Sequence, residues 1–495
     1  MARSRRVVML LFAGSFLLQL AWIVSLPPFR GIDEFDHAYR AAAVAHGQWI
    51  AGPDVPERDG RGSFVTVERR LVAAARPECE DYGYTGYANC NPVRDLGGGY
   101  VTVASAAARY NPVFYWIVGT PANWFHGARS LFVMRMVASL MCSAMVAFVG
   151  WILTQWAQTR WPLVGMLVGL TPTVVYSTVL PAPNGVEMLG GLGLWAALLG
   201  LGQVEGQAER ERRLLWCAVA MAIPLTFVRS LGPLWLAMIV TSMFGYLGWR
   251  RIRTLVDANR RAWGAGTAMV VVAALAGGAW SLASSTNAPS TEPYAHYAHA
   301  LSGSIPQLYL WVFQSFAAFP ARNEFPPLWV FATGMLVFGL LLTVAVKLAT
   351  VRLRILMVWI TAGSLGVPFL ITLATFSRLG TAWQGRYTLP FSLGLALVAG
   401  LVLELNHERL QFARPSLVCG IGLYTAAHLG GTLHVLVTER AHSPLSGTSE
   451  WPVPPTWLVS LAIVGGMAIC TGALLGSAGP RLAPVHPSRT LTATV

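Results

Sequence analysis

A short run of ionisable residues follows the first apolar segment and is the densest candidate for chemistry in the chain. Asp33, His37 and Arg40 are spaced i, i+4 and i+7, so on a helix they share one face, with Glu34 beside it. A carboxylate at the rim of a membrane is partly removed from water, which favours proton uptake and suits Asp33 or Glu34 to act as a general base. A structural role stays open, because acidic residues also stabilise a helix N-terminus through the helix dipole.

A second candidate precedes a late apolar segment, in the sequence Trp383-Gln384-Gly385-Arg386-Tyr387. An arginine can hold a phosphate through bidentate, charge-assisted hydrogen bonds, and the flanking aromatic rings are typical of a membrane interface. We therefore predict that Gln384, Arg386 and Tyr387 bind a lipid phosphate. The alternative is an ordinary arginine whose charge reaches the interface along its flexible stem.

Two further groups of residues extend these candidates. Arg229 and Arg378 fall at the same membrane level and are predicted to assist in phosphate binding. The turn at 181–187 offers Asn184 and Glu187 as substrate contacts, although Asn-Gly chemistry alone explains a tight helical turn.

No CxxC, HExxH or GxxxxGK[ST] motif is found, so no metal ligand is predicted. A divalent cation, Mg or Mn, stays open beside the acidic pair Asp33-Glu34.

The composition decides where these residues must work. Of 495 residues 55% are hydrophobic and only 12% are charged, whereas about a quarter are charged in soluble proteins. This excludes an ordinary soluble enzyme, and the net charge of +13 therefore indicates membrane orientation rather than nucleic-acid binding. Because only one of the 35 basic residues is lysine, the composition also favours a high-GC genome such as that of an actinobacterium.

The hydropathy pattern predicts an all-α, polytopic membrane protein with about twelve transmembrane helices. The predicted spans are 7–26, 131–153, 162–180, 185–202, 214–230, 232–249, 262–284, 327–346, 355–376, 388–405, 416–437 and 456–476. With a cytoplasmic N-terminus, nineteen basic residues fall inside and six outside, the long first loop excluded. The positive-inside rule therefore predicts a multi-pass plasma-membrane protein with both termini cytoplasmic and the candidate site on the extracytoplasmic side.

The spans divide the chain into six regions. They are a cytoplasmic N-terminus with the first helix (1–27), an extracytoplasmic loop (28–130), helices two to seven (131–284), a second extracytoplasmic loop (285–326), helices eight to twelve (327–476) and a cytoplasmic tail (477–495). The first loop holds half of the acidic residues, and its apolar segment 111–125 is too short to span and is predicted to lie in the interface. Segment 33–47 is predicted to be helical, with Gly47 as its C-cap.

Cys79 and Cys90 lie eleven positions apart in the same loop. Because the predicted topology exposes both to an oxidising compartment, we expect a disulfide that contributes roughly 2–3 kcal/mol. Two unpaired surface thiols are the alternative.

The two chemical motifs together resemble a known family. Its members show P-P-x-x-x-x-D-E-x-x-H-x-x-R after the first span and Q-G-R-Y-x-x-P near a late one. This chain carries both in that order, as Pro27-Pro28, Asp33-Glu34, His37, Arg40, Gln384-Gly385-Arg386-Tyr387 and Pro390. The resemblance is to a bacterial membrane family catalogued as domain of unknown function 2142, and more widely to the polytopic glycosyltransferases of the GT-C superfamily. A third stretch, Tyr110-Asn111-Pro112 with Tyr115-Trp116, is similar to an H-P-P-L-x-Y-W segment that opens an interfacial helix, with Asn111 in place of histidine.

The resemblance implies a catalytic carboxylate in a large first external loop with interfacial helices, and sugar transfer on the outer face of the membrane. The donor would be a polyprenyl-phosphate-linked sugar, and the acceptor a cell-envelope glycan, glycolipid or protein. Inverting transfer needs a base and a cationic site for the departing phosphate, which Asp33 or Glu34 and Arg386 supply. His37, Arg40, Tyr110, Asn111, Tyr115, Asn184 and Glu187 are the predicted substrate contacts.

A multi-pass transporter or flippase for a lipid-linked or small substrate is the competing hypothesis. Transporters place ionisable groups near the bilayer midplane and often consist of two similar halves. Here the candidate charges lie at the outer rim, and only the first half carries a long loop. The sequence therefore favours a transferase.

Overall fold

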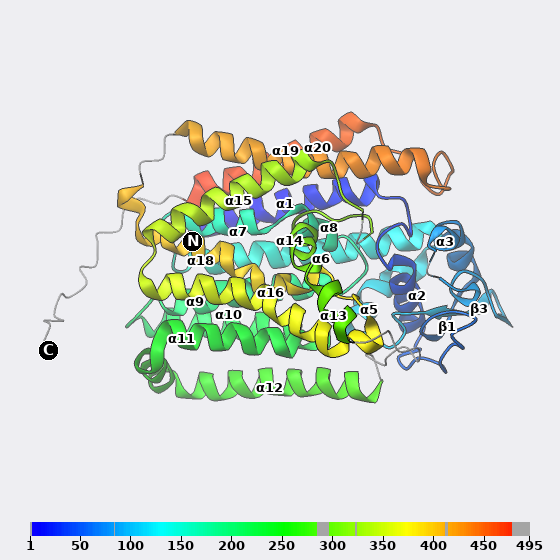
Figure 1. The fold of residues 1–495 in the computed structure, drawn as a ribbon, viewed down its shortest axis with the longest axis horizontal. Coiled ribbons are helices and arrows are strands. Elements are labelled where there is room, and N and C mark those ends of the chain that lie inside the picture. Colours follow the sequence, from blue (N-terminus) through cyan, green and yellow to red (C-terminus); the bar gives the residue numbers. More distant parts are fainter. Residues whose placement is uncertain (1, 84, 285–296, 322–323, 411–413, 478–495) are drawn as a thin grey trace, which may run out of the picture.

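A bundle of long helices makes up most of the molecule in our computed structural model, and a small domain from residues 29–127 covers one end of it (Figure 1). The structure describes residues 2–83, 85–284, 297–321, 324–410 and 414–477. The predicted tail 477–495 falls almost entirely outside the described residues, as does 285–296 of the predicted second loop.

Nine helices in the described part of the chain are long and apolar enough to cross a membrane. These spans are Ser4–Ser25, Ala128–Thr154, Asn184–Leu201, Arg260–Ala283, Leu328–Leu348, Val351–Ser377, Gly385–Leu405, Ser416–His442 and Thr456–Leu475. They belong to α1 (Ala2–Ser25), α6 (Ala128–Thr154), α9 (Asn184–Leu201), α12 (Arg260–Ala283), α15 (Leu328–Leu348), α16 (Val351–Leu379), α17 and α18 (Leu389–Ser392, Gly394–Leu405), α19 (Arg414–His442) and α20 (Thr456–Ser477). The protein is therefore polytopic, and the predicted count of twelve is corrected to nine.

The three other predicted spans are helical but do not qualify as membrane-spanning helices, each for a physical reason. Segment 162–180 is divided into α7 (Trp161–Gly169) and α8 (Pro172–Ser177), because Pro172 cannot donate a backbone hydrogen bond and begins a new helix. Helix α10 (Ala208–Phe227) carries charged residues in its first two turns. Helix α11 (Gly232–Ala258) is interrupted at Gly248, which has φ 76°.

The small domain shows that the all-α prediction was incomplete. It contains a three-stranded antiparallel sheet in the order β1-β3-β2, from β1 (Ser63–Glu68), β2 (Arg94–Gly97) and β3 (Tyr100–Ser105). Gly97, Gly98 and Gly99 all have positive φ and form the tight connection between β2 and β3. Helices α2 (Glu34–Ala45), α3 (Arg69–Asp81) and α4 (Tyr87–Cys90) pack around this sheet.

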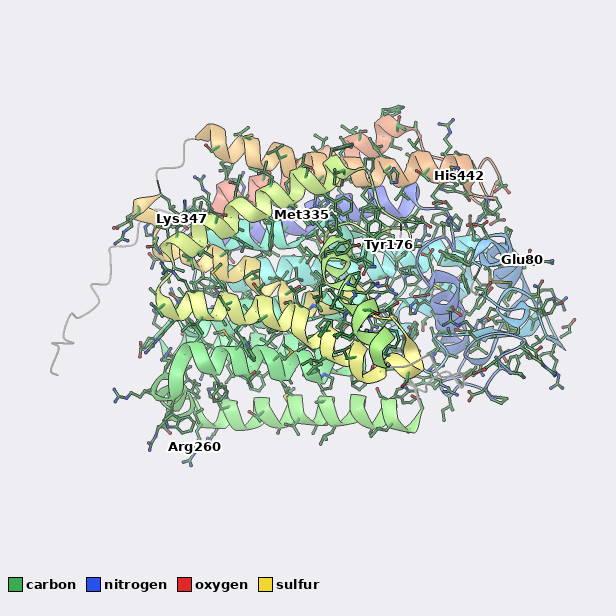
Figure 2. The ribbon with its side chains drawn as sticks, in the orientation of Figure 1. Glu80, Tyr176, Arg260, Met335, Lys347 and His442 are labelled. Atoms are coloured by element: carbon green, nitrogen blue, oxygen red, sulfur yellow. A yellow bond between two sulfur atoms is a disulfide. The ribbon has the colours of Figure 1, made fainter. Side chains whose placement is uncertain are left out.

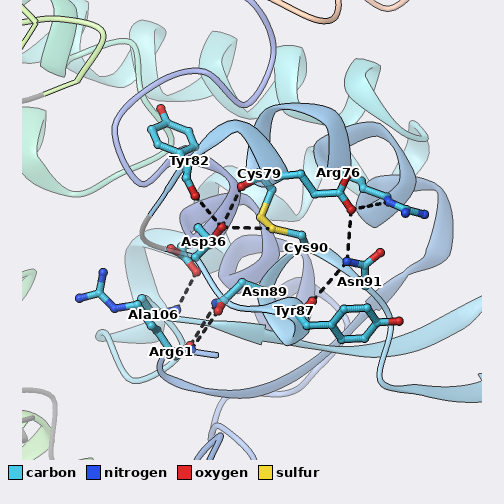
Figure 3. Close-up of a disulfide and its surroundings, with 12 residues drawn as sticks. Asp36, Arg61, Arg76, Cys79, Tyr82, Tyr87, Asn89, Cys90, Asn91 and Ala106 are labelled. Atoms are coloured by element: carbon cyan, nitrogen blue, oxygen red, sulfur yellow. Dashed lines mark hydrogen bonds and ion pairs between the residues drawn. A yellow bond between two sulfur atoms is a disulfide. The ribbon is translucent and has the colours of Figure 1, made fainter. Parts of the chain in front are cut away.

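Two loop predictions are confirmed. Helix α2 falls within the predicted segment 33–47, although its C-cap is His46 and the predicted cap Gly47 follows one residue later with φ 91°. Cys79 and Cys90 form a disulfide that ties α3 to α4, with their Cα atoms 5.4 Å apart. Figure 3 shows this bridge above Asp36 on α2, whose Oδ1 accepts a 2.7 Å hydrogen bond from the backbone N–H of Ala106.

The apolar segment 111–125 does not form a spanning helix. It contains α5 (Pro112–Gly119) and the 3₁₀ helix η1 (Pro121–Trp124), and an eight-residue helix rises only about 12 Å. Trp116 is 49% exposed and Trp124 is 81% exposed. Such exposed rings next to a spanning helix fit the predicted interfacial position.

Both described ends of the chain lie at the end of the bundle opposite to the small domain. Helices α1 and α20 pack in opposite directions and so closely that a Cβ on Gly14 would meet Gly466 O at 2.8 Å. Figure 2 shows Arg260 and Lys347 at this same end, and Glu80 and His442 at the end that the small domain covers.

The remaining described helices are α13 (Tyr297–Ser304) and α14 (Gln307–Phe316), with short 3₁₀ turns η2 (Gly385–Thr388) and η3 (His407–Arg409).

Candidate active site

The segment from Pro27 to Asp33 joins the first spanning helix to the small domain. Phe29 and Asp33 have φ of 68° and 54°, a left-handed backbone conformation that non-glycine residues rarely adopt. Hydrogen bonds hold the segment in place, since Ile32 N–H donates to the hydroxyl of Tyr176 on α8 at 3.1 Å. The Nε of Arg30 donates to Glu439 of α19 at 2.9 Å. The surrounding helices therefore maintain a strained backbone, which often marks a functional site.

Asp33 faces Arg386 across the end of the bundle. The distance between Arg386 Nη2 and Asp33 Oδ2 is 3.6 Å, and the two side chains are 9% and 38% exposed. The Nε of Arg386 is buried and has no hydrogen-bond partner among the described residues. A base candidate and a phosphate-binding candidate from opposite parts of the sequence thus meet, and the guanidinium retains an unused donor.

Arg386 is positioned by close backbone packing. Its neighbour Gly385 donates its N–H to Gln314 Oε1 of α14 at 2.8 Å, and a Cβ at Gly385 would meet Trp311 O at 2.0 Å. Only glycine allows this approach, which explains the Gly-Arg order in the motif. Gln384, the residue before, is 8% exposed, and its Oε1 is a buried acceptor without a partner in the described structure.

A second arginine lies beside Arg386 and is already paired. Arg229 donates Nη1 to Asn184 Oδ1 and to Glu187 Oε2, the latter at 3.4 Å. The Cζ atoms of Arg229 and Arg386 lie 4.9 Å and 5.4 Å from the centre of the Tyr387 ring. Tyr387 therefore contacts both cations, and Glu187 balances the charge of Arg229.

His37 belongs to the same cluster. Its Nδ1 shares a 2.7 Å hydrogen bond with the Tyr115 hydroxyl, and its ring stacks on Tyr110 and Tyr115 with centres 5.8 Å and 5.9 Å away. The pKa of His37 is lowered to about 3, mainly by burial and in smaller part by the charges of Arg229 and Arg386, against the opposing effect of Asp33. The imidazole is therefore neutral at physiological pH, and it can donate or accept a hydrogen bond without carrying a charge.

Three of the predicted site residues make contacts that hold the fold together. Glu34 is fully buried, and both of its carboxylate oxygens receive 2.6 Å hydrogen bonds from Arg135 of α6. Arg40 is also fully buried and donates to the backbone carbonyls of Gln48, Trp49 and Tyr110. Asn111 caps α5 by accepting the N–H of Val113 at 3.1 Å.

These contacts limit what the acidic pair can do. Because both oxygens of Glu34 are occupied by Arg135, Asp33 and Glu34 do not present two carboxylates to one divalent cation. No group of three metal-ligating side chains is found among the described residues. The side chain of Arg378, predicted to assist in phosphate binding, lies outside the described residues.

Sequence reasoning missed two residues that shape the site. Tyr176 and Gln314 lie in apolar stretches and hold the Asp33 and Arg386 segments, respectively. The only available signal was a polar side chain within an apolar segment, which is too common to identify a partner. The geometry otherwise joins Asp33, His37, Tyr110, Tyr115, Asn184, Glu187, Arg229, Arg386 and Tyr387, each of them predicted from the sequence.

A family described as a predicted membrane protein (DUF2142) matches residues 16–395. The chain belongs to this family. No curated protein matches the chain. The DUF2142 match covers both motifs and every residue of the Asp33 and Arg386 cluster, and it ends before α19 and α20. The DUF2142 assignment makes this a multi-pass membrane protein in contact with lipid, which agrees with the nine candidate spans.

Proposed function

We propose that the protein is an inverting GT-C-type membrane glycosyltransferase that moves a sugar from a polyprenyl-phosphate donor to a cell-envelope acceptor. One observation carries this proposal. Asp33 and Arg386, about 350 positions apart in the chain, lie 3.6 Å from each other at one end of the helical bundle. A carboxylate and a guanidinium at this place supply the base and the phosphate-binding cation that such a transfer needs.

The proposed reaction is a single displacement at the anomeric carbon. An acceptor hydroxyl attacks this carbon and gives its proton to Asp33, while the bond from the anomeric carbon to the phosphate oxygen breaks. The electron pair leaves with the polyprenyl phosphate, whose negative charge Arg386 stabilises. The donor phosphate first replaces Asp33 as the partner of Arg386, which frees the carboxylate to act as a base.

The surroundings of the other residues support this division of roles. Glu34 is fully engaged by Arg135, which favours Asp33 as the base. Arg229 is neutralised by Glu187, which favours Arg386 as the principal phosphate ligand. The stacked rings of His37, Tyr110 and Tyr115 offer an amphipathic surface that we assign to sugar or acceptor contact.

We propose that the end of the bundle bearing the small domain faces the outside of the plasma membrane. The disulfide Cys79–Cys90 is typical of an oxidising compartment. Arg260 and Lys347 lie at the opposite end (Figure 2), as the positive-inside rule requires of a cytoplasmic face. Both described chain ends then face the cytoplasm.

The deciding experiment is lipid mass spectrometry on protein purified gently from its native membrane. Wild type is compared with Arg386→Ala and with Arg440→Ala, a control that removes an exposed arginine from the last turn of α19. We expect a polyprenyl-phosphate sugar with the wild type and the control, and its loss from Arg386→Ala. Asp33→Asn is expected to retain the donor and to lose transfer.

The same experiment can reject the proposal. If no such lipid is present, or if Arg386→Ala retains it fully, then Arg386 does not bind the donor phosphate. If the lipid binds as expected but Asp33→Asn transfers sugar at the wild-type rate, the assignment of the base is wrong.

A further inference from the structure

A second pocket lies in the small domain, separate from the Asp33 and Arg386 cluster. Its volume is about 350 Å³, and its lining includes His46, Glu68, Arg69, Arg70, Tyr100 and His126. No residue of the cluster lines it. Asp33 is the N-cap of α2 and His46 is its C-cap, so the length of this helix separates the cluster from the pocket by roughly 20 Å.

By the length of α6, the pocket falls just beyond the stretch of helix that would fill the bilayer hydrocarbon. Arg135 of α6 donates to the carbonyl oxygens of Ile23, Leu26 and Pro27, so this part of α6 is level with the end of α1. From Arg135 to Thr154, helix α6 rises about 28 Å, close to the roughly 30 Å of bilayer hydrocarbon. Ser130 lines the pocket and lies one to two turns beyond Arg135, about 7 Å further out. This distance corresponds to the head-group layer next to the hydrocarbon.

Exposed aromatic and aliphatic side chains lie next to the pocket. Phe125 lines it and is 43% exposed, and Trp124 beside it is 81% exposed. Trp116 and Ile117 on the preceding α5 are 49% and 40% exposed. Rings and apolar chains at this depth are favoured against lipid, so these exposed side chains suit contact with a bilayer surface beside the pocket.

The charges in the pocket select the ligand. Arg69 and Arg70 are 51% and 71% exposed, and although Arg69 pairs with Asp95, each guanidinium carries five N–H donors. The carboxylate in the lining, Glu68, already pairs with His126 at 2.9 Å and lies 3.9 Å from Arg70. Arginine donors of this kind favour a phosphodiester through charge-assisted hydrogen bonds.

We infer that this pocket binds the phosphodiester head group of an anionic bilayer phospholipid and so holds the small domain against the membrane surface. This site is independent of the proposed sugar transfer, because it shares no residue with the Asp33 and Arg386 cluster.

Native mass spectrometry tests this site, with the full chain released from nanodiscs of phosphatidylcholine and phosphatidylglycerol. Wild type is expected to retain phosphatidylglycerol in preference to phosphatidylcholine. The double variant Arg69→Ala/Arg70→Ala is expected to bind it roughly tenfold more weakly or worse. The control Arg76→Ala removes an exposed arginine of α3 that does not line the pocket, and we expect no change.

A variant that is expected to strengthen lipid binding distinguishes a lost binding site from a misfolded protein. Asp95 pairs with Arg69 and accepts the N–H of Gly97, so Asp95→Asn removes the competing charge and keeps an acceptor for the turn. We expect Asp95→Asn to increase phosphatidylglycerol retention. Equal retention by wild type and the double arginine variant overturns the proposal, as does equal retention of the two lipids by the wild type. Retention of a glycan at this pocket in place of lipid also overturns it.

Discussion

At the residue scale, neighbouring acidic side chains have opposite surroundings. Asp33 is partly exposed and faces Arg386, while Glu34 is fully buried against Arg135. A carboxylate that receives a bidentate arginine in the interior stabilises the fold only while both partners are present. The two residues should therefore respond differently to neutralisation.

Glu34→Gln should destabilise the protein by about 3–5 kcal/mol, because it leaves the guanidinium of Arg135 buried without its counter-charge. Asp33→Asn, the matched variant one position earlier, should cost much less, about 0.5 kcal/mol, because Asp33 is 38% exposed and its contact with Arg386 is longer, at 3.6 Å. Thermal unfolding in detergent measures both. Equal losses of stability would contradict the structural role of Glu34.

Asp36 should make stability depend on pH. Burial raises the pKa of this α2 carboxyl from 3.8 to about 8, against the opposing effect of the Ala106 hydrogen bond. The folded state thus binds a proton more tightly than the unfolded state, and the resulting stabilisation is complete below about pH 4 and lost as pH rises through about 8.

Asp36→Asn keeps an acceptor for Ala106 and cannot ionise. We expect the melting temperature of wild type relative to Asp36→Asn to fall between about pH 4 and pH 8. Comparing the two proteins separates the effect of Asp36 from that of His37, whose pKa shift from 6.5 to about 3 also makes stability depend on pH. A difference that stays constant with pH would show that Asp36 does not titrate in this range.

At the element scale, the turn η2 depends on α14. Gly385→Ala would bring a Cβ to 2.0 Å from Trp311 O, so η2 must shift and carry Arg386 with it. A displacement of about 1 Å at a reacting group can reduce the rate by roughly a hundredfold. We expect Gly385→Ala to lose donor-lipid retention and transfer while the bundle still folds.

Gly366→Ala is the control for this prediction, because Gly366 lies in α16 and has open space around it. It should leave lipid retention unchanged. Full retention in Gly385→Ala would show that the close contact between η2 and α14 does not position the arginine.

The disulfide is the second element-scale feature. Replacing both Cys79 and Cys90 by serine should destabilise the region of α3 and α4 by roughly 3 kcal/mol, because a short loop is no longer closed in the unfolded chain. Hydrogen exchange should show faster opening of α3 and α4, with little change in the spanning helices. Cys419→Ser, at an exposed free cysteine, is the control, and equal exchange in both variants would contradict a stabilising bridge.

At the scale of the whole molecule, the two ends of the bundle should face opposite compartments. In a Cys419→Ser background, Arg58→Cys places a thiol on a side chain that is 85% exposed in the small domain. A membrane-impermeant maleimide should label this thiol on intact cells and should label Lys347→Cys only after permeabilisation. The reverse pattern would place the candidate site in the cytoplasm.

The sequence determined the membrane class, the disulfide and most of the residues that form the cluster. These follow from local signals, since hydropathy reports burial in lipid and a motif keeps its spacing wherever it lies. The short strands of the small domain were missed because 4–6 residues carry little periodic signal, and three of the twelve predicted spans proved divided, charged or interrupted.

Only the tertiary structure decided which partner each charged side chain meets. Helical spacing placed His37 and Arg40 on one face, yet Arg40 binds backbone carbonyls while His37 joins Tyr115. Likewise Glu34 meets Arg135, about a hundred residues away, and Asp33 meets Arg386. Such contacts depend on how distant helices pack, and electrostatic roles depend on the resulting burial, so no local pattern could assign them.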